Sequence, residues 1–162
     1  MTLSIALTTV LLGGCDTTEC SPDTGPALEE NMDVARRVSL EVVFRGEHAD
    51  ELISPDFVYH SGATGQEMNR EATLQFWGAF PAAFPDGEIE FYNMIAQDDI
   101  VMFQYTLHGT YSVDIFQAGE AALGRSVVGS GYVTRRIEDG MVMEEWDLPN
   151  MPLLMGQLTA GE

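Results

Sequence analysis

Two side chains that could move protons stand in apolar segments of this chain. Asp147 directly follows Trp146 near the end of an alternating segment, and His60 ends the run Phe57-Val58-Tyr59-His60. Carboxyl and imidazole groups act as general acids and bases, and an unperturbed histidine titrates near neutral pH. Asp147 and His60 are therefore the candidate catalytic residues. Each also has a plainer interpretation, in which Asp147 faces solvent or caps the next turn and His60 is a core or rim residue bonded to the backbone.

Four more side chains are candidates for the wall of a ligand pocket. Tyr59 and Tyr132 could donate hydrogen bonds from their hydroxyl groups, and Trp146 could supply apolar surface. Aromatic residues on strands nevertheless most often pack in the core. His108 lies on the same face of a predicted strand as Met102. It points at a ligand if that face lines a cavity, and at solvent if it does not.

Composition and spacing exclude several kinds of site. The three histidines (His48, His60 and His108) are far apart, so no metal site is expected. No phosphate-binding glycine motif is present, and we expect no cofactor. The chain carries 26 acidic against 7 basic residues, a net charge of −19. Nucleic acid is therefore not an expected partner, and contact with an anionic membrane would need a lipid anchor.

The N-terminus resembles a bacterial lipoprotein signal. An uncharged apolar run, residues 3–12, leads into Gly13-Gly14-Cys15. Residues 1–14 are then a signal peptide, Cys15 is the lipidation site, residues 15–26 are a flexible tether, and residues 27–162 form one domain. This predicts an exported protein, anchored in the cell envelope or on the periplasmic side. The alternative is a disulfide between Cys15 and Cys20 in an exported protein without lipid.

The apolar residues of this chain repeat with the period of a helix in its first half and with the period of a strand in its second half. The first half has the helical period, with a long helix over 27–46 and a short one over 49–53. A turn at 54–56 and a short strand at 57–60 come next. Asn69 is suited to cap a further helix that runs to about residue 84, whose last turns bend or separate at Pro81.

From residue 88 the pattern alternates with the period of a strand. We expect strands over 88–96, 100–111, 125–138 and 141–147, a loop over 112–124, a hairpin at Asp139-Gly140 and a terminal helix over 153–158. Helices followed by strands indicate an α+β fold with an antiparallel sheet. A strongly bent sheet wrapped around the N-terminal helices would bury both patterns and leave a cone-shaped cavity.

Three segments stand out as motifs: RGEHADELISPDFVYH at 45–60, FPAAFPDG at 80–87 and IEDGMVMEEWD at 137–147. Their order and spacing resemble the SnoaL-like polyketide cyclase or ester cyclase family, within the nuclear-transport-factor-two-like superfamily. The resemblance spans residues 28–158. It implies a cone with a deep pocket, often in a homodimer formed through the open sheet. In the family's cyclases, a pocket carboxylate removes a proton next to a carbonyl group, and the enolate attacks a second carbonyl without a cofactor.

One family position differs in this chain. Relatives commonly carry an aspartate four residues after the strand tryptophan, where this chain has Asn150. An asparagine amide cannot act as a general base, so Asn150 is expected only as a pocket residue and Asp147 remains the acidic candidate. The resemblance also places His60 at a position where relatives often have a histidine at the pocket mouth.

Two functions of different classes stay open. The first is a cofactor-free cyclase or isomerase that binds a small apolar carbonyl compound and works through an enolate. The second is a non-catalytic, membrane-anchored lipoprotein that binds an apolar ligand or a partner. The family resemblance favours the first, whereas Asn150 and the export signal favour the second.

Overall fold

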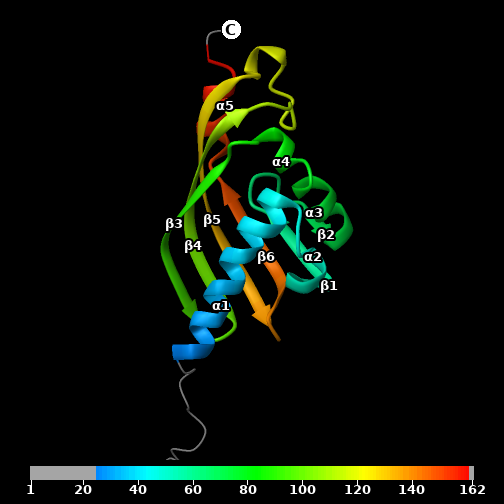
Figure 1. Ribbon diagram of the computed structural model, residues 1–162, viewed down its shortest axis with the longest axis vertical. Helices are drawn as coiled ribbons and strands as arrows, with labels where there is room; N and C mark the ends of the chain where they lie inside the picture. Colours follow the sequence, from blue (N-terminus) through cyan, green and yellow to red (C-terminus); the bar gives the residue numbers. More distant parts are fainter. Residues whose placement is uncertain (1–24, 161–162) are drawn as a thin grey trace, which may run out of the picture.

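The N-terminal helix lies across one face of a curved sheet (Figure 1). The structure, a computed structural model, describes residues 25–160. Helix α1 (Gly25–Arg37) continues without a break into a π-helical segment, Val38–Val43. The single helix predicted over 27–46 is therefore continuous but widens at its centre. Val38, Ser39 and Val42 of the widened segment are buried against the sheet.

The region between the helix and the main strands contains more strand than the sequence indicated. After α2 (Ala49–Leu52), strand β1 runs from Ile53 to Ser61 and pairs with β2 (Glu67–Asn69). The turn predicted at 54–56 is wrong, because these residues belong to β1. Proline lacks the N–H that a regular ladder needs, and Pro55 is accommodated where the pairing register of β1 shifts.

The helix predicted from Asn69 is present in two pieces. The Asn69 side chain accepts a hydrogen bond from the Ala72 N–H at 3.0 Å and caps α3 (Arg70–Trp77). The chain then turns at Gly78, and α4 (Phe80–Ala83) starts with Pro81 in its first turn. The proline separates the two helices, as its missing N–H and fixed φ angle led us to expect.

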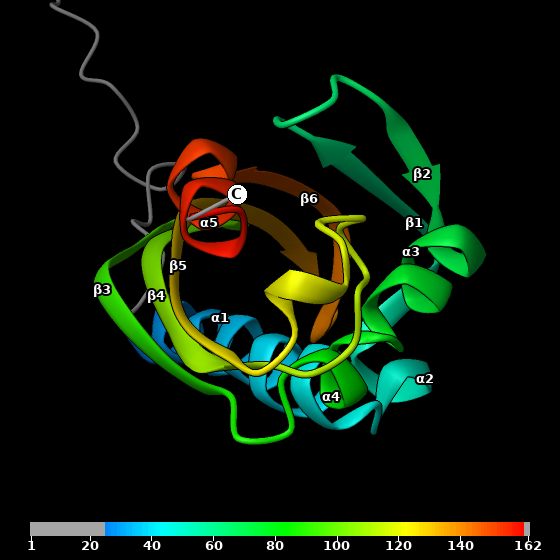
Figure 2. The same cartoon turned by 90° about the horizontal axis from the view of Figure 1, so that it is seen from above.

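Six strands form one mixed sheet in the order β2-β1-β6-β5-β4-β3. The four long strands are β3 (Glu88–Gln97), β4 (Ile100–Tyr111), β5 (Arg125–Glu138) and β6 (Met141–Pro149). They pair antiparallel, as predicted, whereas β1 joins β6 in parallel. Seen from above, the long strands curl into part of an open ring, and α2, α3 and α4 lie on its other side (Figure 2). The α+β class with a strongly bent sheet is confirmed.

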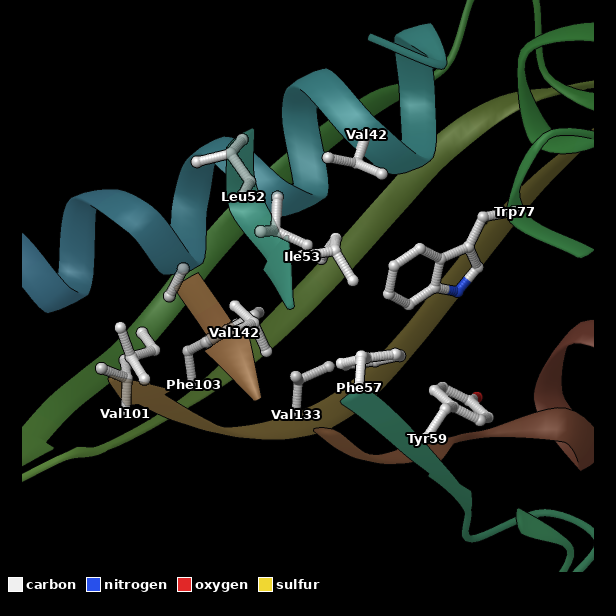
Figure 3. Close-up of a cluster of buried hydrophobic side chains, with 13 residues drawn as sticks. Val42, Leu52, Ile53, Phe57, Tyr59, Trp77, Val101, Phe103, Val133 and Val142 are labelled. Carbon is white, nitrogen blue, oxygen red and sulfur yellow. The ribbon is translucent and has the colours of Figure 1, made fainter. Parts of the chain in front are cut away.

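The concave face of the sheet holds the core. Thirteen buried residues of α1, the π segment, α2, α3 and the strands pack together, with Trp77 beside Phe57 and Tyr59 (Figure 3). The alternation of the β4 sequence left open which face of this strand is the inner one. It is the face of Val101, Phe103 and Leu107, since these residues are buried.

A second buried cluster closes one end of the ring. It joins Phe84, Tyr111 and Leu158, and brings together the loop over 112–124, a short 3-10 helix (Glu120–Ala122) and α5 (Met151–Leu158). Asp114 stabilises the conformation of this loop, because its carboxylate accepts hydrogen bonds from the Tyr111 hydroxyl and from two backbone N–H groups. Helix α5 begins two residues earlier than predicted, since Pro152 fits in the first turn of a helix.

The predicted signal peptide and most of the predicted tether lie outside the described residues. This applies to Cys15 and Cys20, so lipidation, the disulfide and the cell-envelope location stay predictions. Within residues 25–160, none of the helices is both long enough and apolar enough to cross a bilayer.

Candidate functional site

A cavity of about 490 Å³ lies between the concave face of the sheet and the helices. This size is within the usual range for sites that hold small organic molecules. Its wall is mainly apolar and largely aromatic. The aromatic residues that line it are Phe44, Tyr59, Phe76, Trp77, Phe80, Phe84, Phe103, Tyr105 and Phe116.

Asp147 supplies a carboxyl group to this wall. Its strand, β6, is held on both sides: Asp147 faces Ser61 of β1 and Val133 of β5 in the ladder. The N–H of Gly62 also donates to the backbone oxygen of Asp147 at 2.7 Å. The Tyr59 hydroxyl donates to Oδ2 at 3.1 Å, whereas Oδ1 is shielded from solvent and has no hydrogen-bond partner among the described residues.

The surroundings of Asp147 favour its protonated form. Burial, and secondly the negative charge of Glu145, raise the pKa of Asp147 to about 7. The hydrogen bond from Tyr59 and the positive charge of Arg135 act in the opposite direction. A carboxyl group with a pKa near neutrality can both take up and release a proton under ordinary conditions. Asp147 therefore has the property required of a general base or acid.

A buried ion pair lies beside Asp147 in the same wall. The guanidinium of Arg135 donates from Nε to Oε2 of Glu145 at 2.6 Å, and the two side chains are 2% and 3% exposed. Arg135 also bonds the Ser39 hydroxyl at 3.0 Å and the backbone oxygen of Ala35. The guanidinium carbon lies 5.3 Å from the centre of the Phe103 ring. The pair thus ties β5 and β6 to the helical layer.

Three of the seven predicted site residues line this cavity, namely Asp147, Tyr59 and Asn150. Tyr59 and Asp147 are joined directly, although 88 positions separate them in the chain. Asn150 caps α5, because its side-chain oxygen accepts a hydrogen bond from the Leu153 N–H at 3.2 Å. The amide therefore has a structural role at the start of α5.

The other four lie on the outer face of the sheet. His108, Tyr132 and Trp146 alternate with inward-facing neighbours on β4, β5 and β6, and they are exposed. This places His108 in solvent, the second of its two predicted alternatives. Side chains point to opposite faces at successive positions of a strand, so a residue next to a cavity residue points away from the cavity.

His60 is on this outer face as well, and the structure does not bring it to Asp147. Its Nε2 lies 2.7 Å from Oε1 of Glu144, its Nδ1 lies 3.2 Å from Oε1 of Glu67, and its ring stacks on Trp146. The predicted pairing of His60 with Asp147 in one site is therefore corrected. His60 links the hairpin of β1 and β2 to β6.

Sequence reasoning missed Arg135, Glu145 and Tyr105 as cavity residues. A signal for Arg135 was available on its own strand, whereas its pairing with Glu145 was not, because the register shifts between Arg136 and Ile137, on the hairpin side of this pair. Arg135 follows Val133 and precedes Ile137 on the inward register of β5. A charged residue on an apolar register indicates a buried ion pair.

The fold and the cavity define the structural class of this protein. It is an α+β cone whose curled sheet encloses an apolar site with a buried carboxyl group. The SnoaL-like polyketide cyclase family matches residues 33–158, and the chain belongs to this family. No curated protein is similar enough in sequence to count as a relative.

Solved structures of similar proteins agree with this assignment. A candidate SnoaL-like polyketide cyclase from Jannaschia sp. CCS1 has a TM-score of 0.73 at 18% identity, covering 86% of this chain and 99% of its own. IdmH, a candidate polyketide cyclase from Streptomyces antibioticus, has a TM-score of 0.68 at 25% identity, with coverage of 79% and 97%. An epoxide hydrolase of M. tuberculosis shares the fold at a TM-score of 0.63 and 12% identity, covering 84% of this chain and 94% of its own.

Proposed function

We propose that this protein is a cofactor-independent cyclase or isomerase that removes a proton next to the carbonyl group of a small apolar compound. Asp147 acts as the general base. The observation that carries the proposal is the buried carboxyl of Asp147 in an apolar cavity, with its pKa raised to about 7. Membership of a family of cyclases supports the same type of chemistry.

The charges around the cavity indicate what kind of substrate it accepts. Arg135 is neutralised by Glu145, so an ionised Asp147 leaves a net negative charge in the wall. The whole chain carries a net charge of −19. An anionic substrate would meet repulsion in a poorly solvated site, where unpaired charges are costly. The substrate is therefore an uncharged carbonyl compound.

Deuterium exchange tests this function without knowledge of the natural substrate. The ketone 2-tetralone is apolar and bicyclic, and deuterium uptake from D2O at its acidic methylene can be followed by NMR. We expect the protein to accelerate uptake over buffer and the Asp147→Asn variant to lose at least about a hundredfold of the rate, since a positioned base typically contributes 10²–10⁴-fold. The rate should rise with pH through about 7, as Asp147 ionises, and then level off.

The control variant is Glu144→Gln, which removes a carboxylate from the outer face of the same strand and should leave the rate unchanged. Equal exchange rates for the wild type and Asp147→Asn would refute Asp147 as the base. Binding of 2-tetralone with no acceleration by the wild type would instead favour the non-catalytic, ligand-binding function.

We also propose that the outer face of the sheet pairs with a second copy of this chain. Neighbouring strands expose large apolar side chains there, with Tyr132 at 54%, Leu148 at 56% and Met102 at 43% exposure. Contiguous apolar patches of this kind are uncommon on monomers and mark association sites. Tyr132→Glu is expected to shift the protein from dimer to monomer in light scattering. The control is Leu123→Glu, an exposed apolar position in the loop. A wild type that is monomeric at all concentrations would contradict this.

A further inference from the structure

Tyr105 presents an unused hydroxyl group to the cavity. It lies on the inner face of β4 and lines the cavity wall, and its hydroxyl makes no hydrogen bond within residues 25–160. Tyr59 differs, because its hydroxyl donates to Asp147 and is already engaged. Burial, followed by the negative charges of Asp147 and Glu145, raises the pKa of Tyr105 well above its ordinary value. Tyr105 therefore stays protonated and can only offer its hydroxyl as a neutral donor or acceptor.

Gly131 makes room for this tyrosine. It pairs with Tyr105 across the ladder between β4 and β5. A Cβ atom at position 131 would lie 2.7 Å from the Tyr105 hydroxyl oxygen and 2.8 Å from two ring carbons. The phenol ring thus leans across β5, over the space that any other residue would fill. The missing side chain of Gly131 sets the position of the hydroxyl.

The lean of the ring carries the hydroxyl from β4 over β5, and the next strand of the sheet is β6, which carries Asp147. On the next strand, Gly131 pairs with Pro149, and Asp147 lies two residues further along the same inner face. Diagonal neighbours such as Gly131 and Asp147 have Cα atoms about 7–8 Å apart. Because Tyr105 and Asp147 both line the cavity, one bound carbonyl compound can contact both side chains. The arrangement offers a base at one end and a hydrogen-bond donor at the other.

We propose that Tyr105 is a catalytic residue that donates a hydrogen bond to the substrate's carbonyl oxygen while Asp147 takes the adjacent proton, and that Gly131 is its positioning residue. The inference rests on the proposed function. As the C–H bond breaks, its proton passes to the Asp147 carboxylate and its electron pair becomes part of a new C=C bond. The former C=O electrons move onto oxygen, where the Tyr105 hydroxyl stabilises the charge. Donors aimed at a developing oxyanion are among the largest contributions to catalysis.

A pair of ligands that differ by one hydroxyl group tests the donor directly. The oxygen of 2-naphthol resembles that of the enol of 2-tetralone, and naphthalene lacks it. Binding can be followed at pH 6, where Asp147 is mostly protonated, through the fluorescence of Trp77 in the cavity wall. We expect Tyr105→Phe to weaken 2-naphthol about fivefold to tenfold and to leave naphthalene within about twofold, as for loss of one hydrogen bond.

Two glycine variants test whether the position of the Tyr105 hydroxyl matters, and not only its presence. Gly131→Ala should displace the Tyr105 ring and weaken 2-naphthol as Tyr105→Phe does. Gly129→Ala, on the same strand and also in the cavity wall, adds a methyl group 3.6 Å from Leu107, an ordinary contact, and should change the affinities for 2-naphthol and naphthalene equally. Tyr132→Phe removes a tyrosine hydroxyl from the outer face and is the control for Tyr105→Phe.

The deuterium exchange of 2-tetralone distinguishes this inference from the proposed function. Tyr105→Phe should lower the exchange rate at saturating ketone by about a hundredfold, while Tyr132→Phe does not lower it. A normal exchange rate in Tyr105→Phe, or an equal effect on 2-naphthol and naphthalene, would overturn the role of Tyr105 and leave Asp147 as the base. A loss of exchange in Asp147→Asn would then still support the proposed function.

Discussion

At pH 8 the Asp147→Asn variant is expected to be more stable than the wild type, by about 2–4 kcal/mol, although it has lost the proposed base. The reason is the unfavourable burial of an ionised carboxylate beside Glu145. Asparagine carries no charge and its side-chain oxygen can still accept the hydrogen bond from Tyr59. Its NH2 group gains no partner in this place, which offsets part of the gain.

The direction in which stability changes with pH follows from the number of protons that the folded and unfolded states bind. The pKa of Asp147 is 3.8 in an unperturbed state and about 7 in the folded protein. Between these values the folded state binds more protons than the unfolded state, so stability falls as pH rises from about 4 to about 7. Above the folded pKa the whole penalty is present, on the order of 4 kcal/mol for about three units. Below pH 4 both states are protonated and the penalty is absent.

Urea unfolding of both proteins between pH 4 and pH 8 measures this difference. The gain in the variant should grow with pH through the window and stay constant above it. Asp86→Asn is the matched control with the opposite sign, since the backbone N–H and the hydroxyl of Thr110 donate to Asp86 and lower its pKa. A stability difference for Asp147→Asn that is equal at pH 5 and pH 8 would show that Asp147 is not a buried acid with a raised pKa.

Much of this fold could be predicted from the sequence because its patterns are local. The bounds of β4 and β5, the hairpin at Asp139-Gly140 and the cap at Asn69 depend on residues close together in the chain. The parallel pairing of β1 with β6 does not, since it joins segments more than eighty residues apart. The residues around Pro55 likewise do not indicate that a register shift between β1 and β6 will accommodate this proline within a strand.

The difference between local patterns and long-range pairing also explains which parts of the candidate site could be predicted. Asp147 faces Val133 only because the register between β5 and β6 shifts between Arg136 and Ile137. The hairpin register alone would place Asp147 opposite the outward-facing Tyr132, so its inward direction could not be predicted from the sequence. Whether Tyr59 or His60 points inward depends on how β1 docks on β6, and the sequence of β1 favours neither. The alternation of β4 left open whether Tyr105 points inward, and the position of its hydroxyl depends on Gly131 of the neighbouring strand.

Removing one partner of the buried ion pair is expected to have the largest destabilising effect. Arg135→Met leaves Glu145 buried without its cation and removes the hydrogen bonds to Ser39 and Ala35. Breaking such a pair typically costs about 3–5 kcal/mol. The double variant Arg135→Met/Glu145→Gln should recover much of that loss, because no buried charge remains. Arg37→Met, in an exposed helical pair with Glu41, should have a far smaller effect.

The ion pair also acts on Asp147, and this distinguishes an electrostatic role from packing alone. Arg135 lowers the pKa of Asp147 and Glu145 raises it. The pH midpoint of deuterium exchange should therefore move up in Arg135→Met and down in Glu145→Gln, measured below the unfolding temperature of each variant. Packing changes alone would not shift the midpoint in opposite directions. Equal midpoints would show that the pair does not couple to the carboxyl of Asp147. A double variant as unstable as the sum of the single ones would show that Arg135 and Glu145 do not stabilise each other.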